Sequence, residues 1–284
     1  MDFLELIPSE ECQIVEALRT QHSVREICEV LGFTRSNFYY QPKIDASEDV
    51  LRAEIEKLAA QYPTYGYRRM THLLVKTGYR VGYRRVARLM KEDNLCVAVK
   101  RACQTTHSTD GLRPWLNHLK TLDVCRCDQV WVGDVTYVRL KGHFVYLALL
   151  MDVFTRMIRG WKLSQHLTQS LTLKPLEAAL HRSVPEIHHS DQGVQYLSNA
   201  YISVLKAHDI EISIARRGCP WENGYAERLI RTLKEEEVHL NDYQDIYEAR
   251  ERIGHFITQV YHQKRPHSAL GYLTPVEFQR QNLS

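Results

Sequence analysis

Hydrophobic and polar positions follow two different periods in the second half of the chain. From residue 130 onward they alternate along three short runs separated by turn residues, which predicts an antiparallel meander of strands. Strand-like and helix-like runs then follow one another. The expected strands cover 130–140, 143–153, 157–163, 186–189 and 211–215, and the expected helices cover 168–181, 199–208, 221–238 and 243–262. This order predicts an α/β domain built on a mixed five-stranded sheet.

In the first third of the chain the hydrophobic positions recur at helical spacing. Ser23 and Glu26 have the spacing of a capping box that opens a helix, and Gly32 supplies the turn after it. Residues 10–40 are therefore expected to form a helix-turn-helix whose last helix starts at Arg35. A small helical bundle without DNA contacts is the alternative, because this segment is acidic. Further helices are expected at 48–61, 67–76 and 83–93.

A polar, irregular stretch separates the helical region from the α/β region. Gly111 and Pro114 interrupt it, and we expect it to be a linker. The predicted domains are a helix-turn-helix at 1–43, a basic helical segment at 44–103, the linker at 104–128 and the α/β core with a C-terminal helix at 129–284. The core has the element order of a ribonuclease-H-like domain. The predicted fold class is therefore α/β, with a ribonuclease-H-like core preceded by small all-α helix-turn-helix domains.

Charge is distributed unevenly along the chain. The net charge is only +3, yet residues 61–101 carry ten Lys or Arg and two acids, whereas the chain from residue 121 onward carries nineteen of each. Clustered cations repel one another, and a phosphate backbone would relieve that repulsion and release counterions. The segment is therefore predicted to bind DNA, with a solvated basic face as the alternative. The candidate DNA contacts in it are Arg68, Arg69, Arg84, Arg85, Arg88 and Lys91.

The composition excludes several classes of protein. No apolar run approaches the ~18 residues needed to span a bilayer, and the N-terminus lacks the basic region of a signal peptide. The seven cysteines have neither the spacing of a disulfide framework nor that of a zinc site. We therefore expect a cytoplasmic protein with reduced thiols and no membrane partner.

Three acidic residues stand where carboxylates could share a cation. Asp134 lies within an expected strand, Asp191 directly follows another, and Glu227 lies in a later helix. Each alone has a commoner structural use, as a paired strand acid, a turn former or a surface acid in an ion pair. Together they match a divalent-cation site, because hard cations prefer carboxylate oxygens and the acids would repel one another without the cation. Two Mg²⁺ ions about 3.5–4 Å apart would activate the attacking oxygen and stabilise the leaving oxygen of a phosphodiester.

Residues around these acids have competing interpretations. Lys234 lies two turns beyond the third acid on the same helix face, with Arg231 between them. These two cations are predicted to hold DNA phosphates, and a solvated charged stripe is the alternative. His188 and His189 are adjacent rather than at a metal-ligand spacing, so we interpret them as packing at a strand end. Asp152 is interpreted as a turn acid rather than a fourth ligand.

The same residues fall within blocks that resemble the signature sequences of a known family. The blocks are WVGDVTYV, HHSDQGVQYLS, NGYAERLIRTLKEE and YHQKRPHSALGYLTPVEF, preceded by TYGYRRM and YRRVARLMKEDNL. In order and spacing they are similar to bacterial IS-three-family insertion-sequence transposases of the retroviral-integrase superfamily, in particular to their downstream-frame, OrfB-type protein. The resemblance implies that Asp134, Asp191 and Glu227 form a DDE triad that holds Mg²⁺, with Mn²⁺ as a substitute.

The resemblance also implies a function and partners. The expected activity is Mg²⁺-dependent DNA cleavage and strand transfer at insertion-sequence ends, hence DNA transposition, integration and recombination. The expected partners are double-stranded DNA at the element ends and the target, further copies of the chain on DNA, and an upstream-frame protein fused to or paired with this one. The expected location is the bacterial cytoplasm, in association with the nucleoid. Two alternatives stay open: a DNA-binding regulator of transposition that does not cut, and a ribonuclease acting on RNA–DNA hybrids.

Four positions depart from the family pattern. Gly133 stands where a threonine is commoner, which is expected to loosen that strand, and Glu222 stands where an aspartate is usual. Arg228 replaces a small or aromatic residue, and His262 replaces a frequent asparagine. None of the four is an expected metal ligand. The departures therefore bear on substrate contacts rather than on the class of reaction.

Overall fold

The computed structural model describes residues 8–32, 34–39, 46–96, 116–216 and 218–282. The chain separates into two compact units, Met1–Glu54 and Ile55–Ser284, and the boundary falls within one helix, α4 (Ala46–Gln61). Residues 104–115 of the expected linker lie outside the described residues. The part that is described contains one short 3₁₀ helix, His118–Lys120.

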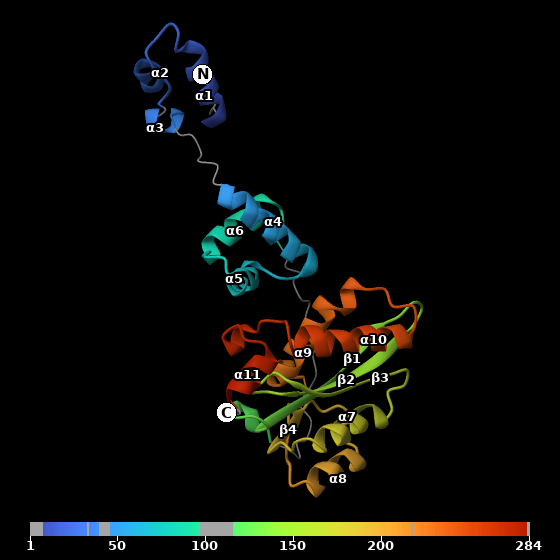
Figure 1. The fold of residues 1–284 in the computed structure, drawn as a ribbon. Helices are drawn as coiled ribbons and strands as arrows, with labels where there is room; N and C mark the ends of the chain where they lie inside the picture. Colours follow the sequence, from blue (N-terminus) through green and yellow to red (C-terminus); the bar gives the residue numbers. More distant parts are fainter. Residues whose placement is uncertain (1–7, 33, 40–45, 97–115, 217, 283–284) are drawn as a thin grey trace. The chain divides into compact units, whose positions relative to one another are not determined.

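The first unit contains a small helical bundle (Figure 1). Its helices are α1 (Pro8–Leu18), α2 (Val24–Leu31) and α3 (Arg35–Phe38). The predicted capping box is confirmed, because Ser23 Oγ accepts a hydrogen bond from the Glu26 backbone N–H at 3.2 Å and Glu26 Oε2 accepts one from the Ser23 N–H at 3.1 Å. Val15, Ile27 and Cys28 form the buried core. The helices expected between residues 10 and 40 are therefore present.

After the end of α4, the second unit contains two helices that pack against each other, α5 (Tyr67–Lys76) and α6 (Tyr83–Glu92). Met70 and Leu74 from α5 and Val86 and Leu89 from α6 are fully buried. The apolar residues therefore recur on one face of each helix, as their spacing predicts. The cations of α6 occupy the remaining surface.

A mixed sheet forms the centre of the second unit. Its strands are β1 (Val130–Arg139), β2 (Phe144–Asp152), β3 (Ile158–Ser164), β4 (Ile187–Ser190) and β5 (Glu211–Ile214), in the order β3-β2-β1-β4-β5. The pairs β1–β2 and β2–β3 are antiparallel, whereas β1–β4 and β4–β5 are parallel. The predicted antiparallel meander and the ribonuclease-H-like fold class are confirmed.

Helices cover both faces of this sheet (Figure 1). The helices α7 (Ser170–Leu180) and α8 (Asn199–Ala207) lie on one face, and α9 (Gly224–Glu236) and α10 (Ile246–His255) lie on the other. Side chains alternate along β1, so that Val132 and Val138 enter the core beneath α9 and α10 while Trp131 enters the core beneath α7 and α8. Asp134 has the same parity as Val132, which places it on the α9 side.

Three C-terminal elements differ from the sequence prediction. The expected helix at 221–238 is preceded by a separate 3₁₀ turn, Pro220–Asn223. The next helix starts only at Ile246, because the Asp245 side chain accepts hydrogen bonds from the first N–H groups and caps it, and it continues as a π-helix over Phe256–Tyr261. A further helix, α11 (Pro275–Asn282), was not predicted. The sequence does contain a signal for the start of this helix, because Thr274 and Glu277 have the spacing of a capping box and exchange its two hydrogen bonds.

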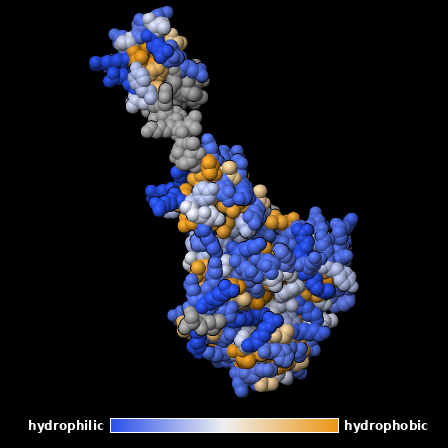
Figure 2. Space-filling view, viewed as in Figure 1, coloured by the Kyte–Doolittle hydropathy of each residue, from blue (hydrophilic) through white to orange (hydrophobic). Residues whose placement is uncertain are grey.

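The surface is mostly polar. Figure 2 shows hydrophilic residues over most of the visible face and hydrophobic residues in small patches. Among the described residues, no helix is both long enough and apolar enough to cross a membrane.

Candidate active site

The parallel pairing of β1 with β4 brings Asp134 next to Asp191. Gly133 on β1 lies opposite Ser190, the last residue of β4. The residue after each of these two is one of the aspartates, Asp134 within β1 and Asp191 directly after β4, and neighbouring strands are about 4.8 Å apart. The two carboxylates are therefore neighbours in space although fifty-six residues separate them in the sequence.

Glu227 reaches the same side of the sheet because of the way α9 is anchored. The helix packs on β1 and β2, and Glu227 lies in its first turn. Asn223, immediately before the helix, is buried and donates a hydrogen bond from Nδ2 to the carbonyl oxygen of Gly133 at 3.4 Å. This bond ties the start of α9 to the residue before Asp134. The sequence analysis did not single out Asn223, and only its place next to Gly224 at the helix start indicates a structural role.

The electrostatics of Asp134 show that these acids influence one another. Burial and the negative charge of Asp191 raise the pKa of Asp134 to about 7. Glu227 raises it further, whereas the Val135 N–H, which donates to Asp134 at 2.7 Å, and the positive charge of Lys234 lower it. Burial and the neighbouring negative charges therefore both favour the neutral form of this carboxyl group. A bound cation would relieve that repulsion.

Asp191 is held by the turn that follows β4. The Gly193 backbone N–H donates to its Oδ1 at 2.9 Å. Neighbouring protein atoms displace water from the carboxylate and raise the pKa of Asp191, and this hydrogen bond offsets part of the effect. A Cβ atom on Gly193 would lie 2.9 Å from the same oxygen. The glycine therefore allows the close approach of the backbone to the carboxylate.

The three carboxylates are oxygen donors of the kind that Mg²⁺ prefers, and their mutual repulsion fits a site for a divalent cation. Among the described residues, no three Asp, Glu, His or Cys side chains are placed so that they could hold a metal ion as they stand. The fold thus brings the acids to one side of the sheet without arranging them as a closed cage.

Two cations were expected beside the acids. Lys234 is half-buried; burial lowers the pKa of its ammonium group, and the negative charge of Asp134 raises it, so the two groups influence each other directly. Arg231, one turn earlier, is exposed. The helix therefore presents one cation close to the acids and a second on the adjoining surface.

The candidate DNA contacts in α5 and α6 differ in their surroundings. Arg68, Arg84 and Lys91 are exposed. Arg69 instead pairs with Glu236 at 2.9 Å, with its guanidinium group 4.8 Å from the ring centre of Tyr65. This placement favours a structural role for Arg69.

The row of cations on α6 is less isolated than its spacing suggests. Arg88, in the middle of the row, pairs with Glu92 one turn later at 2.9 Å. Arg85 is half-buried. The argument from mutual repulsion therefore applies less strongly to this helix than the sequence alone indicates.

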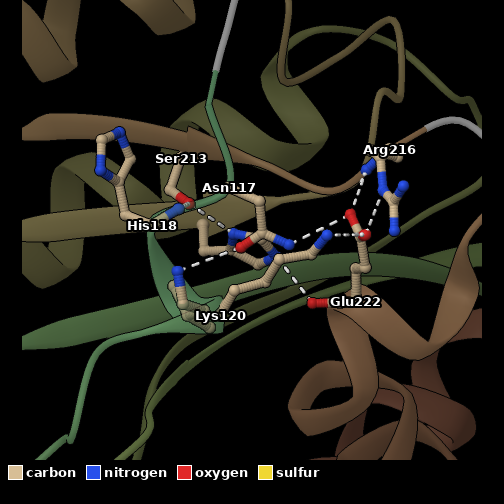
Figure 3. A network of polar contacts seen from close by, with 8 residues as sticks. Asn117, His118, Lys120, Ser213, Arg216 and Glu222 are labelled. Carbon is tan, nitrogen blue, oxygen red and sulfur yellow. Dashed lines mark hydrogen bonds and ion pairs between the residues drawn. The ribbon is translucent and has the colours of Figure 1, made fainter.

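A polar network fixes the loop before α9 (Figure 3). The carboxylate of Glu222 accepts hydrogen bonds from the Arg216 backbone N–H at 2.8 Å and from Asn117 Nδ2 at 3.1 Å, and it pairs with Lys120 and the Arg216 guanidinium. Burial alone would raise the pKa of Glu222, but these partners outweigh it and lower the pKa to about 2. Glu222, one of the departures from the family pattern, is therefore a structural acid.

The other residues near the strand ends also have protein partners. His188 Nε2 bonds to the Tyr201 hydroxyl at 2.9 Å, and His189 bonds through Nδ1 to Ser213 and through Nε2 to the Glu222 carbonyl oxygen. Burial lowers the pKa of His188 to about 3 and that of His189 to about 4, so both rings are neutral. Asp152 is fully buried. It accepts hydrogen bonds from the N–H and hydroxyl of the residue three positions later, which fits a turn acid.

Tyr196 is a further residue at the site that the sequence analysis missed. Its ring is buried against β1, and this burial, with a smaller contribution from the negative charges of Asp134 and Asp191, raises the pKa of its hydroxyl. A Cβ atom on Gly133 would lie 3.0 Å from Tyr196 Cε1. The missing side chain at Gly133 therefore makes room for the tyrosine ring. The expectation that this glycine loosens the strand stays a prediction, and the tyrosine ring occupies the space that a side chain at Gly133 would take.

The remaining departures have different surroundings. His262 Nε2 accepts a hydrogen bond from the Ile158 N–H at 3.0 Å, at the start of β3, and burial lowers the pKa of the imidazole to about 4. Arg228 is exposed on α9.

Comparison with known proteins identifies the family. Two models described as integrase core domain match residues 126–220 and 208–275, and an HTH-like domain model matches residues 46–102. The chain is 33% identical over 264 residues to an uncharacterised 31 kDa protein of insertion element IS600 from Shigella sonnei, covering 89% of this chain and 97% of that protein. It is 31% identical over 247 residues to the transposase of IS904 from Lactococcus lactis, covering 84% and 97%.

Two further proteins are similar at lower identity. Transposase InsF of IS3A from Escherichia coli is 28% identical over 284 residues, covering 95% of this chain and 98% of that protein. Among solved structures, the HTLV-2 integrase catalytic core domain in complex with magnesium is similar at 19% identity and a TM-score of 0.44, covering 54% of this chain and 96% of that one. The chain therefore belongs to the family of insertion-sequence transposases with an integrase core domain.

Proposed function

We propose that this chain cuts the DNA at the ends of an insertion element and joins those ends to a target, in a reaction that depends on Mg²⁺. The proposal rests on one observation. The pairing of β1 with β4 places Asp134 beside Asp191, and α9 brings Glu227 close enough for its charge to act on Asp134. Family membership supports the same reaction, since the IS904 relative is a transposase.

In this proposal the sheet and the helix both contribute metal ligands. Asp134 and Asp191 would hold the metal from the sheet, and Glu227 would complete its coordination from the helix. When bound there, Mg²⁺ supplies charge stabilisation to the attacking and leaving oxygens of the phosphodiester. No side-chain nucleophile is needed, because water or a DNA 3′ hydroxyl attacks the phosphorus.

The protein's own residues position the DNA and the acids. Lys234, held beside Asp134, would bind a phosphate next to the scissile bond, and Arg231 would bind the adjoining backbone. The Asn223 bond to Gly133 keeps Glu227 in register with the strand. Each of these contacts orients a reacting group. Such positioning, together with charge stabilisation, provides most of the rate enhancement of enzymatic phosphoryl transfer.

Duplex DNA also requires a wider surface. We assign backbone contacts to the exposed cations Arg68, Arg84 and Lys91, with Arg85 and Arg88 at their side. We also propose that copies of the chain assemble on DNA, because joining two ends to one target needs both ends at once. An upstream-frame partner, a cytoplasmic location and association with the nucleoid belong to the same proposal.

The decisive experiment measures strand cleavage and strand transfer by the purified full chain on element-end DNA, with and without Mg²⁺. Glu227→Gln should bind the DNA with nearly unchanged affinity and should cut it about a thousandfold more slowly or not at all. The matched control is Glu235→Gln, an exposed acid on the same helix, which should cut like the wild type. Normal cutting by Glu227→Gln would refute the assignment. Binding by the wild type without metal-dependent products would favour a regulator that does not cut.

A further inference from the structure

A pocket of about 580 Å³ lies on another face of the helix that carries Glu227. Tyr225, Arg228 and Thr232 of α9 line it, together with Trp221 from the preceding turn. These α9 residues lie about a third of a turn or more from the face shared by Glu227 and Lys234. The pocket is therefore separate from the acidic site but is built on the same helix, and we call it the α9 pocket.

Aromatic rings form part of the wall of the α9 pocket. Trp221 is 62% exposed and Tyr225 is 41% exposed, although both are large hydrophobic side chains. The guanidinium group of Arg156 lies 4.6 Å from the centre of the Tyr225 ring. Exposed aromatic faces with a stacked arginine are the surfaces on which nucleic acid bases stack.

The charge of the α9 pocket is positive after its ion pairs are counted. Arg69 and Arg265 share the single acid Glu236, at 2.9 and 2.8 Å. Within the described part of the chain, Arg156 and Arg228 form no ion pair. An anionic ligand would thus find two guanidinium groups available at the aromatic wall.

A buried donor also lines the α9 pocket. His267 is 8% exposed, and its Nδ1 lies 3.3 Å from the Arg265 guanidinium, which can only donate. Nδ1 is therefore the acceptor, and because burial lowers the pKa of His267 to about 2, the neutral ring carries its hydrogen on Nε2. That Nε2 makes no hydrogen bond of ordinary geometry among the described residues, and the Tyr261 backbone is the polar group near the ring. A buried donor without a partner costs free energy that a ligand oxygen or ring nitrogen would recover.

We propose that the α9 pocket binds one unstacked nucleotide of a DNA strand. The exposed rings fit a base, the two available arginines fit its phosphate, and the His267 N–H fits an acceptor on either. The volume lies within the ~300–1,000 Å³ of ordinary small-ligand sites. The position on α9 favours a nucleotide within a strand, because the pocket and Glu227 are built on the same helix and a strand held at Glu227 would lie within reach of the pocket. In this respect the inference rests on the proposed function.

The test uses the full chain in EDTA, so that no DNA is cut, and two fluorescein-labelled duplexes. One carries a single unpaired adenine nucleotide, and the other carries an abasic nucleotide at the same place. The wild type should bind the adenine probe about tenfold more tightly than the abasic probe. Trp221→Ala and Tyr225→Ala should lose this preference, and because both side chains are exposed, their truncation removes little packing.

The matched control is Tyr247→Ala. Tyr247 is 73% exposed and also carries a stacked arginine, with the Arg250 guanidinium 5.9 Å from its ring centre, but it does not line the α9 pocket. It should keep the preference for the adenine probe. Equal binding of the two probes by the wild type, or an equal loss in Tyr247→Ala and Tyr225→Ala, would overturn the proposal. Complete displacement of the adenine probe by micromolar deoxyadenosine monophosphate would assign the pocket to free nucleotides and overturn the strand assignment.

Cutting of DNA with Mg²⁺ is measured on the same wild-type preparation. The result for the α9 pocket can then be distinguished from the result for the proposed reaction. Cutting without any preference for the adenine probe overturns the α9 pocket alone. A preference for the adenine probe without metal-dependent cutting supports the pocket and overturns the proposed reaction.

Discussion

Acidic side chains of this transposase-family chain occupy two contrasting environments. Glu222 is enclosed by Arg216, Lys120 and N–H donors, and its pKa falls to about 2 (Figure 3). Asp134 is half-buried next to Asp191, and its pKa rises to about 7. The first acid is already neutralised by the protein, and the second is not. The contrast separates acids that hold the fold from acids that are available to a cation.

The same contrast explains which parts of the site are rigid. Glu222 fixes the loop before α9, and Glu236, the last residue of α9, accepts two hydrogen bonds of 2.8 Å from Arg265. Paired acids thus hold both ends of α9, while Glu227, which forms no ion pair with another described residue, lies between them. A stable frame around repelling carboxylates is what a preorganised cation site requires.

The largest expected effect on stability comes from removing a neutralised acid. Glu222→Ala should lower the free energy of unfolding by about 2 kcal/mol, because Arg216, Lys120 and Asn117 lose a shared acceptor whose side chain is only 2% exposed. Urea unfolding measures the change. Glu186→Ala is the control, since Glu186 pairs with Arg126 at an exposed site and should change stability by less than about 0.5 kcal/mol. Equal losses of unfolding free energy in the two variants would contradict the stabilising role assigned to Glu222.

A second prediction concerns pH and the unneutralised acid. The pKa of Asp134 is about 7 in the folded chain, above its ordinary value, so the folded state binds this proton more tightly than the unfolded state. The stability that this proton contributes is present at low pH and is lost as pH rises from about 4 to about 7. Glu222 has the opposite sign, because its contribution is present above pH about 4.5 and lost as pH falls toward 2.

Urea unfolding in EDTA at pH 5 and pH 8 tests this prediction. Between these values the Asp134 contribution should fall by about 2 kcal/mol in the wild type. Asp134→Asn should remove that fall, whereas Asp123→Asn, at an exposed acid, should keep it. Added Mg²⁺ should stabilise the wild type at pH 8 more than it stabilises Asp134→Asn. A fall of the same size in Asp134→Asn would show that other groups cause the pH dependence and would contradict the raised pKa of Asp134.

The smallest expected effect concerns packing between β1 and the loop after β4. Gly133→Ala should destabilise the fold by about 1 kcal/mol, because the new Cβ would lie 3.0 Å from the Tyr196 ring. Gly224→Ala is the control, since nothing lies within 4 Å of its Cβ position and its φ is −58°. Thermal unfolding compares the two variants. A neutral Gly133→Ala would show that the ring moves freely and does not fix the strand beside Asp134.

Sequence pattern predicted the elements of the core well, because period-two alternation at 130–140 and helical spacing at 67–76 have few alternative interpretations. It also identified the three acids, since their order matches a family signature. Register between β1 and β4 is a nonlocal property, so the closeness of Asp134 and Asp191 required the structure. The capping box at Thr274 and Glu277 was a local signal that the sequence analysis overlooked.

The partners of individual cations could not be predicted in the same way. Arg69 and Arg84 belong to similar basic runs, yet Arg69 pairs with Glu236, a residue 167 positions away in the sequence. The role of Tyr196 likewise depends on the absence of a side chain at Gly133 on another strand. Both contacts arise from tertiary packing, on which local periodicity carries no information.

The most direct test of the central claim is a crystal structure of the chain grown with Mn²⁺, in which anomalous scattering locates the ions. We expect Mn²⁺ bound by carboxylate oxygens of Asp134, Asp191 and Glu227, and no Mn²⁺ at Glu222 or Glu236, which the protein already neutralises. Ordered Mn²⁺ elsewhere, with any of the three acids turned away from the others, would contradict the account.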